Sequence, residues 1–152
     1  MKNHILPSEY TAVVGVINPV NKSTAGSSST GWISAADYGA YLAIIAAGAI
    51  AATASVAAKL EQATDSSGTG AKDITGKAIT TLGGSDDNKQ ALINLRPEEL
   101  DLANDFTHFR LTLTVADTAS PDVGALIAAL VLGTAARFEP VTQATTVAQT
   151  VA

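Results

Sequence analysis

A strand–loop–strand pattern at Ala54–Gly76 constrains the fold more than any other stretch of this chain. Val56, Ala58, Leu60 and Gln62 alternate with Ser55, Ala57, Lys59 and Glu61. This period of two is typical of a half-buried strand. Small polar residues and glycines follow at Asp65–Gly70, and they tolerate positive φ and end a strand. An apolar pattern resumes at Ile74. The stretch therefore predicts two strands that are joined by a tight loop and turn their apolar faces to one core.

Other segments repeat this period. The clearest is Phe106–Ala116, whose predicted inward side chains are Phe109, Leu111, Leu113 and Val115. Further strands are expected at Thr11–Ile17, Gln90–Arg96 and Ala125–Leu132, and Pro97–Asp101 predicts a short helical turn that carries the chain from one sheet to the other. About seven or eight short strands with turn signals between them predict an all-β fold, an antiparallel β-sandwich that is jelly-roll-like.

The run Tyr38–Ala58 contains no charged residue and allows three interpretations. A transmembrane helix would have the required length, but alanine supplies most of its hydrophobicity and no basic flank sets an orientation. A soluble helix is favoured by alanine propensity. Two strands joined near Gly48 are favoured by the tyrosines and isoleucines and by the β pattern downstream. We expect strands. Because both faces would be apolar, the strand is either covered on both sides or sealed on one side by another subunit.

The length of 152 residues suits one folded unit with extended arms. We expect residues 1–30 to form an N-terminal arm, a short strand and a flexible polar loop, residues 31–140 to form the sandwich, and residues 141–152 to form a C-terminal tail. Neither arm has enough apolar periodicity to fold locally, so we expect both to contact other subunits. Pro7 and Glu9 interrupt the N-terminus before an apolar region forms, which argues against a signal peptide.

Composition limits the possible functions. The net charge of −5 and the lack of a Lys/Arg cluster argue against a nucleic-acid partner. The absence of cysteine rules out disulfides and thiolate chemistry. Small residues dominate and aromatic residues are scarce, so a core of this composition gains less from burial than its length suggests. Association with other subunits would bury more apolar surface.

No catalytic, cofactor-binding or metal-binding residues are expected. The two histidines, His4 in the arm and His108 on the outward face of a strand, do not lie in a triad setting. Asp86 and Asp87 are interpreted as a solvated turn, and Trp32 as a side chain that packs over the edge of the sandwich rather than as a sugar platform. We therefore do not expect an enzyme or a cofactor.

Four runs together resemble a family of small virion proteins that tailed phages and prophages encode near the major capsid gene. The runs are Leu60–Gly76, Gly83–Asp101, Phe106–Val115 and Ala129–Pro140, and the similarity covers most of Gly31–Pro140. The resemblance implies a structural component of the phage head or its neck. It supplies no catalytic residues and no fold.

The resulting expectation is a capsid decoration or cement protein that binds the outside of the major capsid lattice and stabilises the head. Its expected partners are the major capsid protein and copies of itself, with a trimer favoured and with no nucleic acid or membrane. It would be made in the host cytoplasm and reside on the phage head surface. A head–tail connector or neck component is the alternative within the virion. A carbohydrate-binding β-sandwich is the alternative from another class, and it would need several exposed aromatic side chains.

Overall fold

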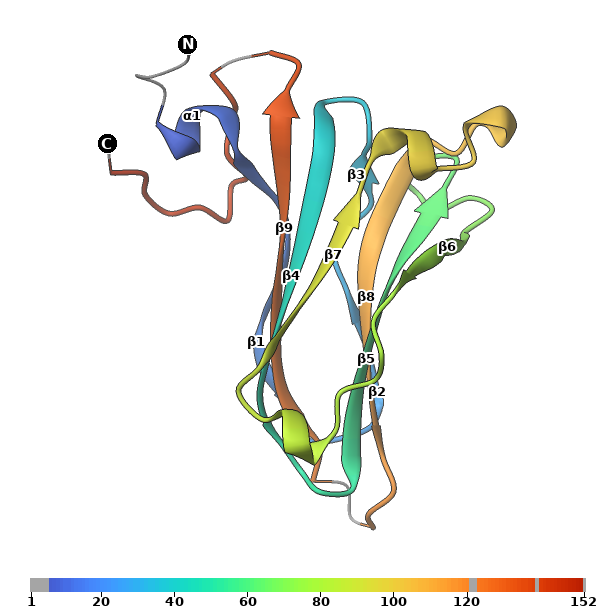
Figure 1. The fold of residues 1–152 in the computed structure, drawn as a ribbon, viewed down its shortest axis with the longest axis vertical. Coiled ribbons are helices and arrows are strands. Elements are labelled where there is room, and N and C mark those ends of the chain that lie inside the picture. Colours follow the sequence, from blue (N-terminus) through green and yellow to red (C-terminus); the bar gives the residue numbers. More distant parts are fainter. Residues whose placement is uncertain (1–5, 121–122, 139, 152) are drawn as a thin grey trace.

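The computed structural model describes residues 6–120, 123–138 and 140–151, and Figure 1 shows them as two β-sheets packed face to face. Sheet A has four strands, in the spatial order β1 (Ala12–Lys22), β9 (Ala125–Ala136), β4 (Tyr38–Ile50) and β7 (Gln90–Leu95). Sheet B has the order β2 (Gly26–Ser29), β8 (His108–Asp117), β5 (Ala54–Ala63) and β6 (Lys72–Ala78), and the short β3 (Ile33–Ser34) also pairs with β8. The remaining elements are the helix α1 (Pro7–Tyr10) and the 3-10 turns η1 (Gly84–Asp86), η2 (Pro97–Glu99) and η3 (Leu102–Asn104).

The strand order confirms the expected sandwich and its jelly-roll connectivity. Every strand pair is antiparallel, and apart from the β5–β6 hairpin the long strands alternate between the two sheets along the chain. Strands β2 and β3 both pair with β8, so each layer is four positions wide, and two antiparallel layers linked in this way form a jelly roll. The turn η2 lies between β7 in sheet A and β8 in sheet B, as the sequence predicts.

The core lies between the sheets and is made from the inward half of each alternating strand. The four inward residues predicted for β8 are 0–1% exposed. The ring of Tyr41 from sheet A packs edge-on against Phe109 from sheet B, with 4.6 Å between the ring centroids. The Tyr41 hydroxyl donates a hydrogen bond of 2.9 Å to the Ser34 carbonyl, so its polar end is satisfied.

The N-terminal part of the chain is more ordered than expected. The strand predicted over Thr11–Ile17 continues as β1 to Lys22, with a bulge between Ile17 and Val20 that accommodates Pro19. A proline is tolerated here because β1 is an edge strand and the bulge interrupts its ladder. Part of the expected flexible loop is the strand β2, so residues 12–29 belong to the two sheets and do not form a separate arm.

Hydroxyl pairs explain why a serine-rich segment forms β2. The hydroxyls of Ser27 and Thr114 lie 2.8 Å apart, and those of Ser29 and Thr112 lie 2.9 Å apart. Cross-strand hydroxyl pairs of this kind stabilise a sheet without apolar side chains. The sequence of Gly26–Ser29 alone does not reveal these hydroxyl pairs, because the partner threonines lie far along the chain.

Both helical interpretations of Tyr38–Ala58 are wrong, and so is the expected junction near Gly48. Strand β4 runs through Gly48 to Ile50, and the turn to β5 lies at residues 51–53. The glycine has a packing role instead, because a Cβ at Gly48 would lie 2.7 Å from Cδ2 of Leu126 on the neighbouring strand.

The C-terminal segment, residues 140–151, lies against its own domain, which corrects the expectation that it contacts only other subunits. The Gln143 side chain accepts a hydrogen bond of 3.0 Å from the Val13 N–H and donates to the carbonyls of Ser8 and Thr11. Figure 1 shows this segment beside α1 and the end of β1. It therefore ties the N-terminal helix to the edge of sheet A. Residues 1–5 of the predicted N-terminal arm lie outside the described residues.

Candidate interaction surface

The outward side of sheet A is apolar and exposed across all four strands, and it is the candidate functional surface. We call its outward-facing apolar residues the apolar face. They are Val13, Val16, Leu42, Ile44, Ala46, Leu92, Leu126, Ala128, Leu130 and Leu132. Leu92, Leu130 and Leu126 are 60%, 41% and 43% exposed, although leucine side chains are usually buried.

Strand register arranges these side chains in rows. Val16, Leu130, Ile44 and Leu92 are successive cross-strand neighbours, so one row of large side chains crosses the whole sheet. The next row holds Ala128 opposite Ala46, in the middle of the sheet. The apolar face therefore has a ridge of large side chains beside a trough of small ones.

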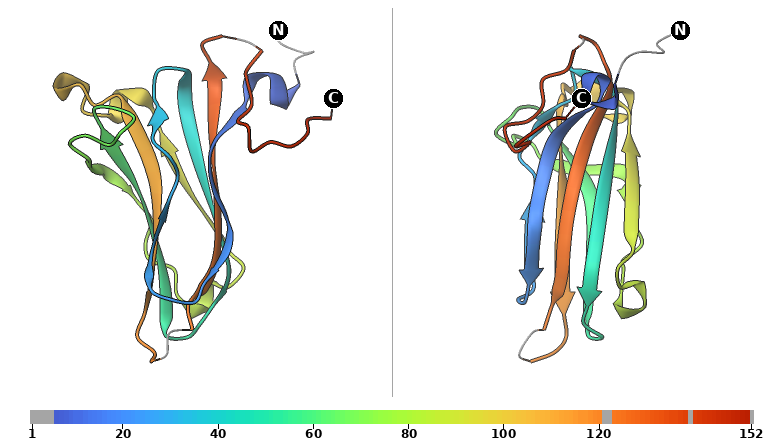
Figure 2. Two further views of the ribbon diagram at one scale, coloured as in Figure 1. Left: turned by 180° about the vertical axis from the view of Figure 1, so that it is seen from behind. Right: turned by 90° about the vertical axis from the view of Figure 1, so that its left-hand side faces the viewer.

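The middle of this face is uncovered. The right-hand view in Figure 2 looks onto the outer side of sheet A, and there β1, β9, β4 and β7 lie side by side with no other drawn segment in front of their central part. The C-terminal segment approaches only at one end, where Val147 and Gln149 line a hollow together with Val13 and Leu132. The rows around Leu130 are left open.

The outer side of sheet B has a different character. Glu61 accepts hydrogen bonds of 2.7 Å from Arg110 Nε and from the Thr112 hydroxyl, and Lys59 forms ion pairs with both Glu61 and Asp73. Partial burial would raise the pKa of Glu61, but the hydrogen bonds from Thr112, Arg110 and Lys59 outweigh it and lower that pKa. This face is a paired, polar surface suited to contact with water.

The aromatic side chains do not form an open platform. The guanidinium of Arg110 lies 4.6 Å from the centroid of the Trp32 ring, and Gly68 approaches the edge of the same ring. Tyr38 and Tyr41 are 8% and 2% exposed, so both belong to the core. Trp32 therefore packs over the sandwich edge, as the sequence predicts. Phe138 is 85% exposed.

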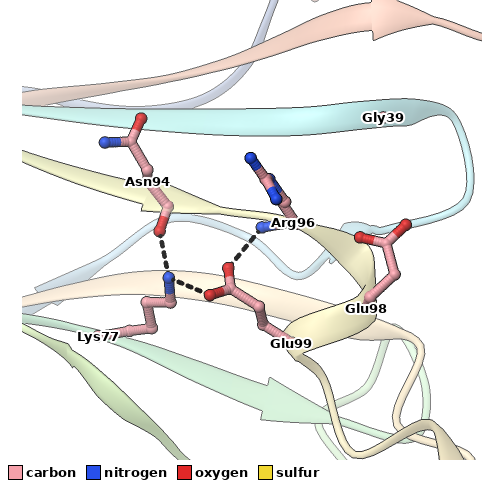
Figure 3. A pocket seen from close by; sticks show the side chains of 6 residues that line it. All are labelled: Gly39, Lys77, Asn94, Arg96, Glu98 and Glu99. Atoms are coloured by element: carbon pink, nitrogen blue, oxygen red, sulfur yellow. Dashed lines mark hydrogen bonds and ion pairs between the residues drawn. The ribbon is translucent and has the colours of Figure 1, made fainter.

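A polar hollow of about 640 Å³ lies at the seam between the sheets, and Figure 3 shows its lining. Lys77 Nζ donates a hydrogen bond of 2.8 Å to the Asn94 carbonyl and forms an ion pair of 2.7 Å with Glu99. The ion pair and the Arg96 N–H lower the pKa of Glu99. Because Lys77 already has both partners, it fastens the β6 edge of sheet B to the β7 edge of sheet A rather than offering a free cation.

The residues singled out in the sequence have local structural contacts. The Nδ1 atom of His108 lies 3.0 Å from the Thr107 hydroxyl. Asp86 accepts a hydrogen bond from the Gly83 N–H and pairs with Lys89, while Asp87 accepts one from the Ile50 N–H. His4 lies outside the described residues.

Two searches of the described part of the chain were negative. Over residues 6–120, 123–138 and 140–151, no group of three or more His, Cys, Asp or Glu side chains could hold a metal ion. None of the helices in those ranges has the length and hydrophobicity that a membrane crossing requires.

Sequence reasoning found only part of the apolar face. It noted that the strands in Tyr38–Ala58 are apolar on both sides, which is the signal for an outward apolar row. It did not identify Leu92, because Ala91, Ile93 and Leu95 alone supply the inward pattern of β7. An apolar residue at an outward position of an otherwise alternating strand could have revealed it.

No family model matches this chain, and no curated protein matches it either. Among solved structures, a chain from Desmodium yellow mottle tymovirus is similar to it over most of its length. The two chains are 12% identical with a TM-score of 0.43, and the match covers 90% of this chain and 89% of that chain.

Proposed function

We propose that this protein is a structural component of a phage virion, a decoration or cement protein that binds the outside of the major capsid lattice and stabilises the head. The observation that carries the proposal is the apolar face, an uncovered sheet surface of large aliphatic side chains. Extended apolar patches of this kind mark contact surfaces between proteins. The resemblance of four sequence runs, which covers most of Gly31–Pro140, to small virion proteins of phages supports the virion as the place where that contact is made.

The proposed mechanism is stabilisation by mass action. A protein that binds only the assembled lattice stabilises each site by RT ln(1 + [L]/Kd), about 2.7 kcal/mol when the free protein is at a hundred times Kd. Modest affinity is sufficient when many sites are occupied. The partners in this proposal are the major capsid protein and copies of this chain, and the protein resides on the head surface after synthesis in the host cytoplasm.

Two other functions have less support. A neck or connector component would use the same apolar face, but it would be present in few copies at one vertex. A carbohydrate-binding module would need exposed aromatic rings in a cluster, whereas Trp32 is stacked against Arg110 and two of the three tyrosines are buried.

The test is to compare complete phage particles with particles that lack this protein. If it is a cement protein, particles without it release DNA at a lower temperature, and adding the purified protein back restores the original release temperature. Equal release temperatures for the two kinds of particle would exclude a cement role. Detection of the protein at a single vertex would favour the neck.

A further inference from the structure

We propose that the apolar face binds the same face of a second copy, so that two chains pair sheet A against sheet A about a two-fold axis. This inference rests on the proposed function for the place where the pair acts, and it deepens that function. Of the two partners proposed there, the apolar face takes a copy of this chain, and other surfaces of the pair contact the capsid protein. Three features of the surface carry it: its area, its lack of charge and its relief.

The area of the face matches a dimer interface. Four strands spaced by about 4.8 Å span about 19 Å, and the rows from Leu132 to Leu126 extend about 20 Å along β9, so these rows cover about 400 Å². This area has no polar residue on the central strands β9 and β4, and its polar residues lie on the edge strands β1 and β7. Strand β1 has 11 residues and is therefore about 36 Å long. With the same width, the whole outer side of sheet A has an area of about 700 Å². Stable interfaces bury about 800 Å² per partner, with an apolar centre inside a polar rim. The rim here consists of uncharged polar residues such as Gln90 and Asn94.

Charge favours contact through this face. Each chain carries a net charge of −5, so two copies repel one another in most orientations. The apolar face has no charged member, whereas the outer side of sheet B carries the Lys59, Glu61, Asp73 and Arg110 network. Apposed apolar faces bring two acidic chains together without placing like charges opposite each other.

The relief of the face fits a two-fold arrangement. The ridge that contains Leu130 and Ile44 lies directly beside the trough formed by Ala128 and Ala46. A two-fold axis between these rows places the ridge of each copy over the trough of the other. A two-fold interface is isologous, so every contact occurs twice and the same surface serves both partners.

Variants of Leu130 test this proposal in purified protein. Leu130 is near the inferred axis and 41% exposed, so L130K alters the surface and leaves the core intact. Leu102 on η3 is 52% exposed and lies outside the apolar face, which makes L102K a matched control. Each protein would be examined by sedimentation velocity over a range of concentrations, with thermal unfolding as the check on folding. If L130K does not fold, L92K at the 60% exposed Leu92 replaces it.

We expect the wild-type chain and L102K to form dimers, and L130K to weaken the dimer Kd by at least about tenfold with little change in melting temperature. Mixing L130K with L130E should restore dimers, because the two-fold axis brings the introduced charges close together. A wild-type chain that stays monomeric or forms trimers would overturn the proposal. So would an L130K variant that dimerises with the same Kd as the wild-type chain. If the purified chain does not dimerise through this face but particles without the protein release DNA at a lower temperature, the cement function stands and the apolar face is assigned to the capsid protein.

Discussion

Ile44 of β4 and Leu130 of β9 lie opposite each other on the outer side of sheet A, while the next residue along β4, Ile45, is completely buried. Two adjacent isoleucines on one strand therefore serve different purposes. Ile45 stabilises the fold, and Ile44 belongs to the apolar face.

This pair gives a direct comparison of core and surface. I45A should lower the free energy of unfolding by about 2–5 kcal/mol, because it removes buried methyl groups and leaves a cavity. I44A should lower it by less than about 1 kcal/mol, because Ile44 is only half-buried in the single chain. Denaturant unfolding at concentrations where the chain is monomeric measures both values. Similar losses for the two variants would show that the outer side of sheet A is covered within the chain.

Gly68 allows the loop between β5 and β6 to approach the only tryptophan. Its φ is +86°, and a Cβ at this position would lie 2.5 Å from Trp32 Nε1. G68A should therefore destabilise the protein by about 1–2 kcal/mol and shift the tryptophan fluorescence, since the ring must move. Gly76 is the control, because its φ is also positive, at +75°, but a Cβ there meets nothing within 4 Å, so G76A should leave the spectrum unchanged. An unshifted spectrum for G68A would contradict the described packing.

Lys77 connects the open edges of the two sheets. Its side chain is 17% exposed and bonds to both the Asn94 carbonyl and Glu99. K77M should lower the free energy of unfolding by about 1 kcal/mol, because it removes the side-chain donor to the Asn94 carbonyl and leaves Glu99 with only the Arg96 N–H. K89M removes a more exposed pair, in which Lys89 is 59% exposed, and should change stability by less than about 0.5 kcal/mol. Equal effects in thermal unfolding would argue against a role for Lys77 in fastening the seam.

Asp117 makes the fold sensitive to acid. The N–H groups of Gly124, Ala119 and Val123 donate to its carboxylate and hold its pKa well below the usual value. Since the folded pKa is below the unfolded one, the resulting stability is present above about pH 4 and is lost as the pH falls below it. D117N should be less stable than wild type at neutral pH and should lose less stability between about pH 5 and pH 3. Parallel stability curves for the two proteins would contradict this role.

Local alternation was sufficient to predict the core of this fold. The inward residues of β8, the β5–β6 hairpin and the helical turn η2 follow from patterns contained within a few neighbouring residues. The jelly-roll order also agrees with the expectation from many short strands and turns.

Features that depend on distant partners could not be predicted in the same way. Strand β2 exists because Ser27 and Ser29 meet threonines of β8, and the C-terminal segment is held because Gln143 reaches the backbone of β1. Part of the apolar face could be predicted from the sequence, because some of the expected strands are apolar on both sides. Its continuity across four strands required the register, which places Leu92 of β7 beside Ile44 of β4.

The most direct test of the central claim is a density map of purified phage heads by electron cryomicroscopy. We expect density for this jelly roll on the outside of the head at positions that repeat with the capsid lattice, and we expect that density to be lost from particles made without the protein. A map with no such density at lattice positions, or with it only at the neck vertex, would rule out the cement function.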